Sequence, residues 1–418
     1  MRVLDVHQFF AGPSSPGPDQ PRAVVRALAD RGHHVDVIAC DFNAYSEQSE
    51  APEEWRSDAG GVVRVHRLPA PRNMRAGLRR RLATYVRFAW AAWRFGKRLE
   101  RPDVVLSSIQ PLFAGYAGMR LARRWKVPML LEVRDLWPDA LVAKGAISRL
   151  QAAPLERLAR NLYFGAARVV SLTPGIRREL VGKGLDASRI DLFPNGFKDR
   201  PPSVDGWIRE GVRREFGWGD SFVAVFTGAH TEVTAVDVMV RAAECLKDRP
   251  DIRIDLFGAG QTKAPAQELA KRLGLSNVHF HDAVPKPQVA RILEGADVAL
   301  MTLFKSPLIH IYFESKLIDY LGAGKPILAA MDGVQPDVIA AAAAGRCVGS
   351  FDHRGLARLI REAADNRGPL RPMGESGARF VRQRLAQPVI LSRYVDMLEA
   401  VAAGRSGGIE AWDPLGIT

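Results

Sequence analysis

The sequence predicts an α/β protein built from two doubly wound, Rossmann-like domains that face each other across a cleft. Three observations carry this prediction. Short apolar runs of strand length alternate with helical patterns, the alternation pauses once near the middle, and 418 residues exceed the length of one ordinary domain. Composition agrees, because 47% hydrophobic and 25% charged residues are typical of globular chains with a sizeable core.

The expected strands are short runs rich in Val, Ile and Leu. In the first half they occupy residues 3–6, 35–39, 62–68, 104–107, 129–133 and 169–172. In the second half they occupy residues 222–227, 252–257, 278–281, 298–303 and 326–329. Helical segments such as 23–31, 233–247 and 265–273 lie between them. Because this alternation produces parallel strand pairs, two parallel sheets covered by helices on both faces are expected.

The pause in the pattern falls on two clusters of turn and breaker residues, 194–196 and 199–202. We interpret it as the linker between the domains. Ligands of open α/β sheets bind beyond the carboxyl ends of the strands, so site residues are expected just after strands. The predicted organisation is an N-terminal Rossmann-like domain over 1–196, a C-terminal Rossmann-like domain over 197–386, a helix over 387–404 and a disordered tail over 405–418.

Charge and cysteine content narrow the partners and the compartment. The net charge of +13, from 59 Lys and Arg against 46 Asp and Glu, predicts an anionic partner: a nucleotide, a nucleic acid or an anionic lipid. The three cysteines have no paired spacing, which is typical of a reducing cytoplasm. The first residues read as a strand rather than a signal peptide, and no run of eighteen apolar residues predicts a membrane span.

The first motif, Phe-Gly-Ala-Gly-Gln-Thr-Lys over residues 257–263, directly follows an expected strand and precedes a helix. The glycines Gly258 and Gly260 let backbone N–H groups approach a phosphate, and Lys263 adds a compensating charge. The alternative is a plain tight turn with a solvated lysine, which a short glycine pair does not exclude.

The second motif spans residues 312–327 and reads as loop, helix, glycine turn and strand. Lys316 lies at the N-terminal end of the expected helix, where free N–H groups favour an anion. Asp319 follows one turn later and could accept both ribose hydroxyls of a nucleotide. The alternative is an exposed helix with an i, i+3 Lys–Asp pair.

This segment resembles the donor-binding helix of retaining glycosyltransferases of family 4, which have the GT-B fold of two Rossmann-like domains. The resemblance covers nearly the whole chain, because further motifs occur in the family's order: Arg-Gly-His at 31–33, Asn-Gly at 195–196, Phe-Thr-Gly at 226–228 and Ala-Asp-Val at 296–298. It is closest to a subgroup with Ser-Lys (Ser315 and Lys316) ahead of the carboxylate, found in bacterial surface-polysaccharide and lipid-linked oligosaccharide assembly.

The resemblance implies roles for individual residues. Asp319 would hold the donor ribose, and Lys316 and Lys263 the diphosphate. The family's usual second Glu, eight residues before the ribose carboxylate, is Ile311 in this chain. Glu314 and His310 lie close enough in sequence to take over its contacts to the sugar hydroxyls.

Two further loops complete the expected donor side. Gly228, in Thr-Gly-Ala-His-Thr-Glu over 227–232, should let a helix beginning near Val233 point its N-terminus at the phosphates. No Lys or Arg follows until Arg241, so this subsite relies on backbone groups. Val284 lies in the loop after the strand at 278–281, which would face the base.

Two loops of the first half are candidates for the acceptor side. Arg134 and Asp135 stand at the end of the strand at 129–133, in an Arg-Asp-Leu-Trp-Pro string that resembles the same subgroup, near donor phosphate and acceptor hydroxyl. The alternative is an ion pair that closes the loop. The loop after the first strand carries Gly12 and Gly17 among several prolines and shapes the acceptor site or is a plain surface loop.

A basic helix is expected between residues 72 and 98, which hold nine Lys and Arg and no Asp or Glu. Arginine beside tryptophan suits a bilayer interface with anionic headgroups. The alternative is a helix packed on its own sheet with a solvated charged face. No nucleic-acid-binding module is recognisable, so a nucleic-acid partner is not expected. The predicted membrane-contact residues are Arg79, Arg80, Arg87, Trp90, Trp93 and Arg94.

Taken together, the resemblance implies a retaining hexosyl- or N-acetylhexosaminyltransferase that uses a nucleotide-diphosphate sugar, with UDP as the expected carrier. The acceptor is expected to be lipid-linked or a polysaccharide, at the inner face of the cytoplasmic membrane. No cofactor or metal is expected, because lysines stand where a metal would neutralise the diphosphate and no Asp-X-Asp motif ends a strand. The alternatives are a nucleotide-sugar 2-epimerase and a catalytically inactive scaffold of the same fold.

Overall fold

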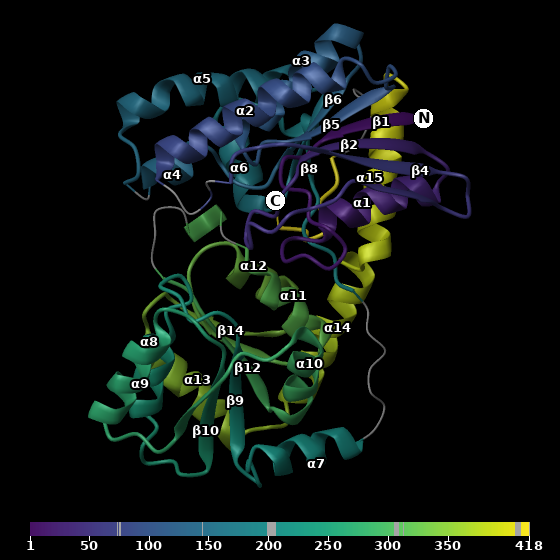
Figure 1. Ribbon diagram of the computed structural model, residues 1–418. Helices are drawn as coiled ribbons and strands as arrows, with labels where there is room; N and C mark the ends of the chain where they lie inside the picture. The colour runs from purple at the N-terminus through teal and green to yellow at the C-terminus, as the bar shows by residue number, and fades with distance from the viewer. Residues whose placement is uncertain are drawn as a thin grey trace. The chain divides into compact units, whose positions relative to one another are not determined.

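The computed structural model describes residues 1–72, 74, 77–143, 145–198, 206–304, 309–311, 313–405 and 411–417. The chain divides into two compact units (Figure 1). Unit 1 comprises Met1–Asn195 and Pro388–Pro414, and unit 2 comprises Gly196–Gln387 and Leu415–Ile417. Each unit holds its own sheet, so the prediction of two Rossmann-like domains is confirmed.

Unit 1 contains an eight-stranded sheet in the order β3-β4-β2-β1-β5-β6-β7-β8. All neighbours are parallel except β3 and β4, which are antiparallel. The prediction of a purely parallel sheet is therefore wrong at this edge. The strands are β1 (Arg2–Val6), β2 (His34–Cys40), β3 (Glu53–Arg56), β4 (Val62–Leu68), β5 (Val104–Ser108), β6 (Met129–Val133), β7 (Arg168–Ser171) and β8 (Ile190–Leu192).

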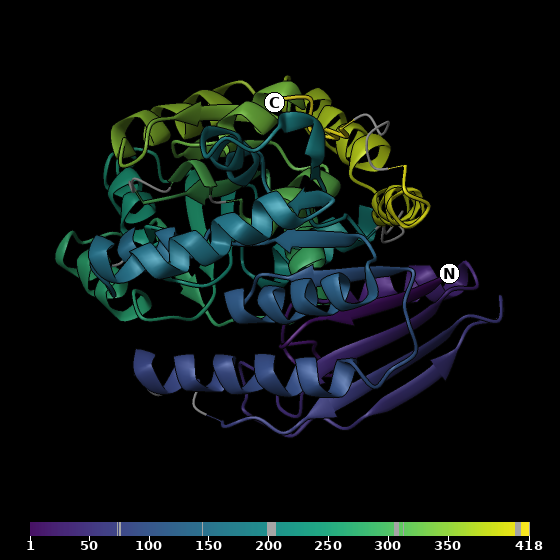
Figure 2. The same cartoon turned by 90° about the horizontal axis from the view of Figure 1, so that it is seen from above.

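Helices cover the unit 1 sheet. The neighbouring helices α2, α3 and α5 run side by side (Figures 1 and 2). Helix α5 begins with a capping box between Ser148 and Gln151, which satisfies two free backbone N–H groups. The helices are α1 (Gln20–Asp30), α2 (Leu78–Gly96), α3 (Leu112–Trp125), α4 (Asp139–Ala143), α5 (Arg149–Gly165), α6 (Pro174–Gly182), the 3-10 helix η1 (Ala187–Arg189) and α15 (Gln387–Ala402).

The C-terminal segment packs on unit 1. In α15, Asp396 accepts a 2.5 Å hydrogen bond from Arg31, and the Tyr394 ring lies 5.0 Å from that of Phe193. Beyond the helix, the Trp412 ring also lies 5.0 Å from Phe193, and Leu415 is fully buried. The prediction of a disordered tail is therefore wrong for residues 411–417, because aromatic and apolar side chains anchor them.

Unit 2 contains a six-stranded parallel sheet in the order β11-β10-β9-β12-β13-β14. Its strands are β9 (Phe222–Thr227), β10 (Ile252–Phe257), β11 (Val278–His281), β12 (Val298–Thr302), β13 (Ile327–Ala330) and β14 (Gly345–Val348). Its helices are α7 (Gly206–Glu215), α8 (Val236–Glu244), α9 (Lys263–Arg272), α10 (Lys286–Gly295), η2 (Ile309–Ile311), α11 (Ser315–Gly322), α12 (Gln335–Ala341), α13 (His353–Asp365) and α14 (Leu370–Arg384).

Two apolar cores lie on opposite faces of the unit 2 sheet. Alternate residues of one strand contribute side chains to the two cores: in β9, Phe226 belongs to the larger core and Val225 to the smaller. The larger core joins the sheet to α8, α9 and α13, and the smaller joins it to α7 and α10. The sheet is thus covered on both faces, which leaves its carboxyl edge and the loops beyond it as the place for polar side chains.

Candidate functional site

Two glycine loops lie side by side at the carboxyl edge of the unit 2 sheet. Gly228 follows β9, and Gly258 and Gly260 follow β10, with φ angles of +151°, +157° and +149° that favour glycine. A Cβ on Gly258 would overlap the carbonyl oxygen of Gly228, and one on Gly260 would overlap that of His230. His230 N also donates to Ala259 O at 2.9 Å. The glycines therefore permit a close approach that side chains would prevent.

The helix after the first glycine loop begins later than predicted. The sequence predicts a start near Val233, but α8 begins at Val236. Thr234 Oγ1 accepts a 3.0 Å hydrogen bond from Thr231 N, and Ala235 adopts a left-handed conformation with φ of +43°. These contacts form a separate turn, so the loop between β9 and α8 is longer and more polar than predicted.

The two predicted diphosphate lysines both lie at this edge. Lys316 Nζ forms a 2.7 Å ion pair with Glu314 and lies 4.4 Å from the centre of the Phe226 ring. A Cβ on Gly228 would come within 3.0 Å of the same ammonium. Lys263 is the first residue of α9, and its Nζ donates to His281 O at 2.8 Å and to Asp282 at 2.9 Å. Two cations from different helices therefore flank the glycine loops.

The donor-helix motif forms the helix that the sequence predicts. Helix α11 begins at Ser315, which is exposed, and Asp319 is exposed one turn after Lys316. The loop before it is anchored, because Glu314 N donates to Gln335 at 3.1 Å. The buried Tyr320 hydroxyl lies 2.8 Å from Thr227 N, so α11 is tied directly to the end of β9.

The acceptor-side candidate His310 and the donor-side candidate Val284 lie in other segments of unit 2. His310 lies in η2, with residues 305–308 and 312 outside the described part of the chain. Val284 follows β11 and packs partly against the smaller core, on the α7 and α10 face. The structure therefore brings together Gly228, Gly258, Gly260, Lys263, Glu314 and Lys316, and gives His310 and Val284 separate surroundings.

One residue of this edge had no role in the sequence interpretation. His230 is fully buried, and its ring centre lies 5.7 Å from that of Phe226 and 6.4 Å from that of Phe280. Burial, together with the charges of Lys263 and Lys316, lowers the pKa of His230 to about 4. A lone histidine in a loop carries no spacing signal, so only the fold reveals this position.

In unit 1, one of the two predicted strand-end residues, Arg134, belongs to a buried polar group, whereas the other, Asp135, is exposed. Arg134 is 8% exposed, and its guanidinium lies 3.4 Å from Glu132. Burial and the charge of Arg134 lower the pKa of His7 to about 3, and burial and Glu132 raise the pKa of Asp5 well above its ordinary value. Asp135 is exposed and accepts a short hydrogen bond from the Gln110 amide.

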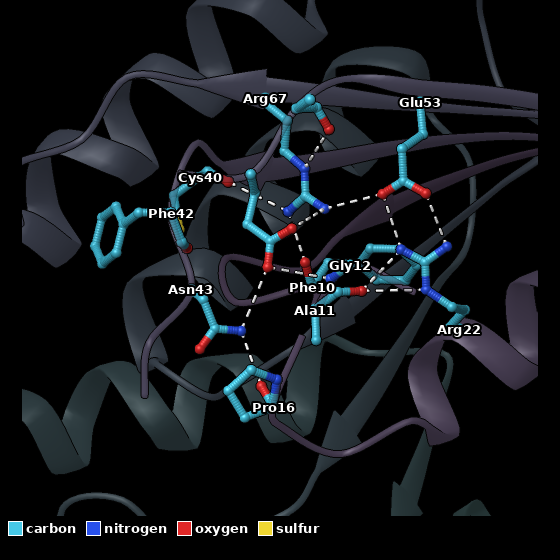
Figure 3. Close-up of polar contacts among 12 residues, drawn as sticks. Phe10, Ala11, Gly12, Pro16, Arg22, Cys40, Phe42, Asn43, Glu53 and Arg67 are labelled. Carbon is cyan, nitrogen blue, oxygen red and sulfur yellow. Dashed lines mark hydrogen bonds and ion pairs between the residues drawn. The ribbon is translucent and has the colours of Figure 1, made fainter. Parts of the chain in front are cut away.

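The loop after β1 is held by two arginines and two glutamates from distant positions (Figure 3). Arg67 Nη1 donates to Phe10 O at 2.6 Å, and Arg22 Nη2 donates to Ala11 O at 2.8 Å. Both arginines also pair with Glu53, at 3.2 and 2.9 Å. The first residues of the predicted acceptor-side loop, 10–12, are thus clamped, while most of residues 13–19 are exposed.

Both predicted glycines of this loop have specific surroundings. Gly12 N donates to Glu50 at 3.2 Å, and a Cβ on Gly12 would overlap that carboxylate. Burial by itself would raise the pKa of Glu50. Hydrogen bonds from Ser15 and Gly12 outweigh that effect, so the pKa is lowered. Gly17 has a φ of +142°, and Asn43 donates to the neighbouring Pro16 O at 2.8 Å.

Helix α2 carries the predicted basic surface. Trp90 is 59% exposed and Val86 is 50% exposed, and the Arg94 guanidinium lies 4.8 Å from the Trp90 ring. Arg79, Arg80 and Arg87 are exposed on the same helix. Trp93 is half-buried on the same helix, with Lys97 and Arg120 at 4.7 and 5.8 Å from its ring.

Within the described residues, no group of three or more His, Cys, Asp or Glu is placed to hold a metal ion. A search of the same residues finds no helix that combines the length and the apolar character needed to cross a membrane.

Comparison with known proteins assigns the family. Residues 20–196 match the model of a glycosyl transferase 4-like domain, and residues 209–380 match the model of glycosyl transferases group 1. Together the two models match well over half of the chain. The chain belongs to the glycosyltransferases. This glycosyltransferase is 28% identical over 320 residues to the D-inositol 3-phosphate glycosyltransferase of Streptomyces coelicolor, covering 70% of this chain and 67% of that protein.

Other relatives and solved structures that resemble this chain are also glycosyltransferases or have their fold. The putative colanic acid biosynthesis glycosyl transferase WcaI of Escherichia coli K12 is 24% identical, with 72% of this chain and 76% of that protein covered. Anabaena HepE in complex with UDP has a TM-score of 0.70 at 14% identity, covering 96% of this chain and 99% of that chain. WaaG, a glycosyltransferase involved in lipopolysaccharide biosynthesis, has a TM-score of 0.62 at 19% identity, covering 98% and 100%. These likenesses show the GT-B fold.

Proposed function

We propose that this glycosyltransferase transfers a hexosyl or N-acetylhexosaminyl group from a UDP-sugar, with retention, to a lipid-linked or polysaccharide acceptor at the cytoplasmic face of a membrane. The observation that carries the proposal is the convergence of Lys263 and Lys316 on the glycine loops of unit 2. Cations and close-approaching backbone are what a diphosphate needs. UDP-bound HepE has the same fold, which supports UDP as the carrier.

In this proposal, the bond between the anomeric carbon and the diphosphate oxygen breaks through an oxocarbenium-like transition state. The acceptor oxygen bonds to the same face of the sugar, and its proton passes to the leaving diphosphate. The protein positions the reactants and stabilises the charge that grows on the diphosphate. Lys263 and Lys316 are assigned to that charge, Asp319 to the ribose and Glu314 to the sugar hydroxyls. The two lysines supply the charge neutralisation without a metal.

Each lysine is already paired with a carboxylate, Lys316 with Glu314 and Lys263 with Asp282. Donor binding therefore exchanges these partners for phosphate oxygens. Glu314, once released, is available for the sugar hydroxyls. We assign Arg134 and Asp135 to the acceptor side, with the clamped loop that carries Gly12 and Gly17.

The membrane part of the proposal depends on α2. An exposed tryptophan among arginines, without acidic neighbours on the helix, suits an interface with anionic headgroups. The net charge of +13 favours the same surface. The names of the relatives WcaI and WaaG, which refer to colanic acid and lipopolysaccharide, support an acceptor of surface-polysaccharide type.

The test is nucleotide release from UDP-, GDP- and dTDP-sugars, with and without membrane extract, for the wild type and Lys316→Ala. Release from one donor that requires extract and is lost in the variant supports a transferase with an extractable acceptor. Conversion of the donor without extract favours a 2-epimerase instead. Nucleotide binding with no turnover of any donor contradicts catalysis and favours the inactive scaffold.

A further inference from the structure

His230 is a buried polar side chain whose hydrogen-bonding capacity is unused. It is 0% exposed, and neither Nδ1 nor Nε2 has a hydrogen-bond partner among the residues that the structure describes. A buried donor or acceptor without a partner costs about 1–3 kcal/mol, so native proteins retain few of them. An apolar side chain of similar size would avoid this cost between Phe226 and Phe280. The imidazole therefore calls for an explanation other than packing.

The neighbours of His230 are those of an anion site. Gly258 lies so close that a Cβ there would stand 2.9 Å from His230 Cδ2, and the charges of Lys263 and Lys316 both act on the ring. Thr262 lies at the start of the ten-residue helix α9, and its N donates to His230 O at 3.1 Å. Its Oγ1 is likewise buried and without a partner. Two unused polar side chains thus adjoin the helix start.

The sequence of the loop explains why a histidine is needed there. Between Thr227 and Val240 the chain has no Lys or Arg, so the cations at this edge come only from α9 and α11. Within the β9–α8 loop, His230 is a side chain close enough for the charges of both lysines to act on it. Lys263 and Lys316 repel a positive charge on the ring, which favours a neutral imidazole with one N–H donor.

We propose that His230 binds the diphosphate of the nucleotide-sugar donor, with one ring nitrogen donating a hydrogen bond to a phosphate oxygen and Thr262 Oγ1 donating a second. The inference rests on the proposed function, because it assigns two further ligands to the donor site. It gives unit 2 a means of recognising the diphosphate that is separate from its recognition of the nucleoside.

The experiment measures UDP and uridine affinities, by calorimetry and ligand-observed NMR, for the wild type, His230→Phe, His230→Gln and Thr262→Val. A hydrogen bond to a charged group is worth roughly ten- to a hundredfold in affinity. His230→Phe is therefore expected to weaken UDP binding by about that factor and to leave uridine binding unchanged. His230→Gln, whose amide still donates, is expected to recover part of the loss.

An unchanged ratio of UDP to uridine affinity in both His230→Phe and Thr262→Val would overturn the inference. Thr262→Val supplies the test if His230→Phe does not fold, as judged by its thermal unfolding. Failure of the donor site on which the proposed function depends gives a different result: the wild type itself then binds neither UDP, GDP, dTDP nor inorganic pyrophosphate. Failure of catalysis alone appears as nucleotide binding without turnover in the wild type.

Discussion

Lys316 and Glu314 form an ion pair of 2.7 Å at the start of α11, and each side chain is less than one-fifth exposed. The pair holds the ammonium over the Phe226 ring and beside Gly228. Partly buried charges are screened less than surface charges, so the ammonium acts strongly on an anion that reaches this loop.

The first prediction concerns the charge at this position. Lys316→Met is expected to lower kcat by a hundred- to a thousandfold, or about 3–4 kcal/mol, because a group that stabilises the leaving diphosphate is removed. Steady-state nucleotide release measures the effect. Lys271→Met, which removes an exposed lysine of α9, is the matched control and should retain wild-type kcat. Equal activity of the two variants would remove Lys316 from the mechanism.

The second prediction concerns the contact between the glycine loops. Gly258→Ala is expected to destabilise unit 2 by about 3 kcal/mol, since it adds backbone strain at φ of +157° to an overlap with Gly228 O. Gly274→Ala is the control, because Gly274 has φ of +60° with open space around it. It should cost only about 1 kcal/mol. Denaturant unfolding measures the stability of both variants. Equal destabilisation by Gly258→Ala and Gly274→Ala would show that the structure relaxes to relieve the overlap with Gly228 O.

The third prediction concerns the clamp on the loop after β1. Arg67→Met removes the arginine that pairs with the buried side chain of Glu50, while Glu53 keeps its pair with Arg22, and the change is expected to cost about 3–5 kcal/mol in the free energy of unfolding. Arg64→Met, which breaks an exposed pair with Glu54, should cost less than about 1 kcal/mol. Denaturant unfolding measures the stability of the two variants. A small decrease in the free energy of unfolding for Arg67→Met would show that the loop keeps its conformation without this arginine.

The fourth prediction concerns pH. The pKa of His7 is about 3 in the folded state and about 6.5 when unfolded, so the unfolded state binds more protons between these values. Stability is therefore lost as the pH falls below about 6.5. The loss due to His7 is about 2 kcal/mol between pH 7 and 5. The free energy of unfolding of His7→Gln, measured at pH 7 and pH 5, should therefore decrease by about 2 kcal/mol less than that of the wild type.

Replacement of the exposed His34 by Gln is the control for this pH effect. It should reproduce the wild-type decrease. If His7→Gln also reproduces it, the imidazole of His7 is not responsible.

The fifth prediction concerns α2. Replacing Arg79, Arg80 and Arg87 together by Gln is expected to weaken binding to vesicles that contain phosphatidylglycerol by about a hundredfold, at roughly 1 kcal/mol per charge. Co-sedimentation measures the binding. The same change at Arg358, Arg371 and Arg379 of unit 2, all exposed, equalises the net charge and should leave binding nearly unchanged. Equal losses would indicate a general charge effect rather than an α2 surface.

The sequence predicts strands best where they are buried on both faces. The fully buried β6 and β9, and β10 with one partly exposed residue, occur at the predicted residues, because mainly apolar runs of strand length favour a buried strand. The antiparallel β3, with the sequence Glu-Glu-Trp-Arg, has no such run. Pairing with β4 at the sheet edge makes this segment a strand. The local sequence of one segment does not indicate which other segment it will pair with.

The candidate site divides in the same way. Glycine-rich turns and the donor helix are local patterns, so Gly258 and Lys316 could be predicted with their elements. His230 could not be predicted, because its place in the candidate site depends on its proximity to Lys263 and Lys316, which come from other parts of the chain. The clamp of Arg67 on Phe10, 57 residues apart, is likewise invisible before the strands are assembled.

The path of α15 sets an order for synthesis. Unit 1 takes its sheet from residues before 196 and a covering helix from residues after 387, with residues 196–387 of unit 2 between them. On the ribosome, this large part of unit 2 is therefore synthesised before α15 emerges. Until then Phe193 lacks Tyr394 and Trp412, and Arg31 lacks Asp396. Unit 1, whose translation begins first, is consequently finished only after residues 196–387 of unit 2 have been synthesised.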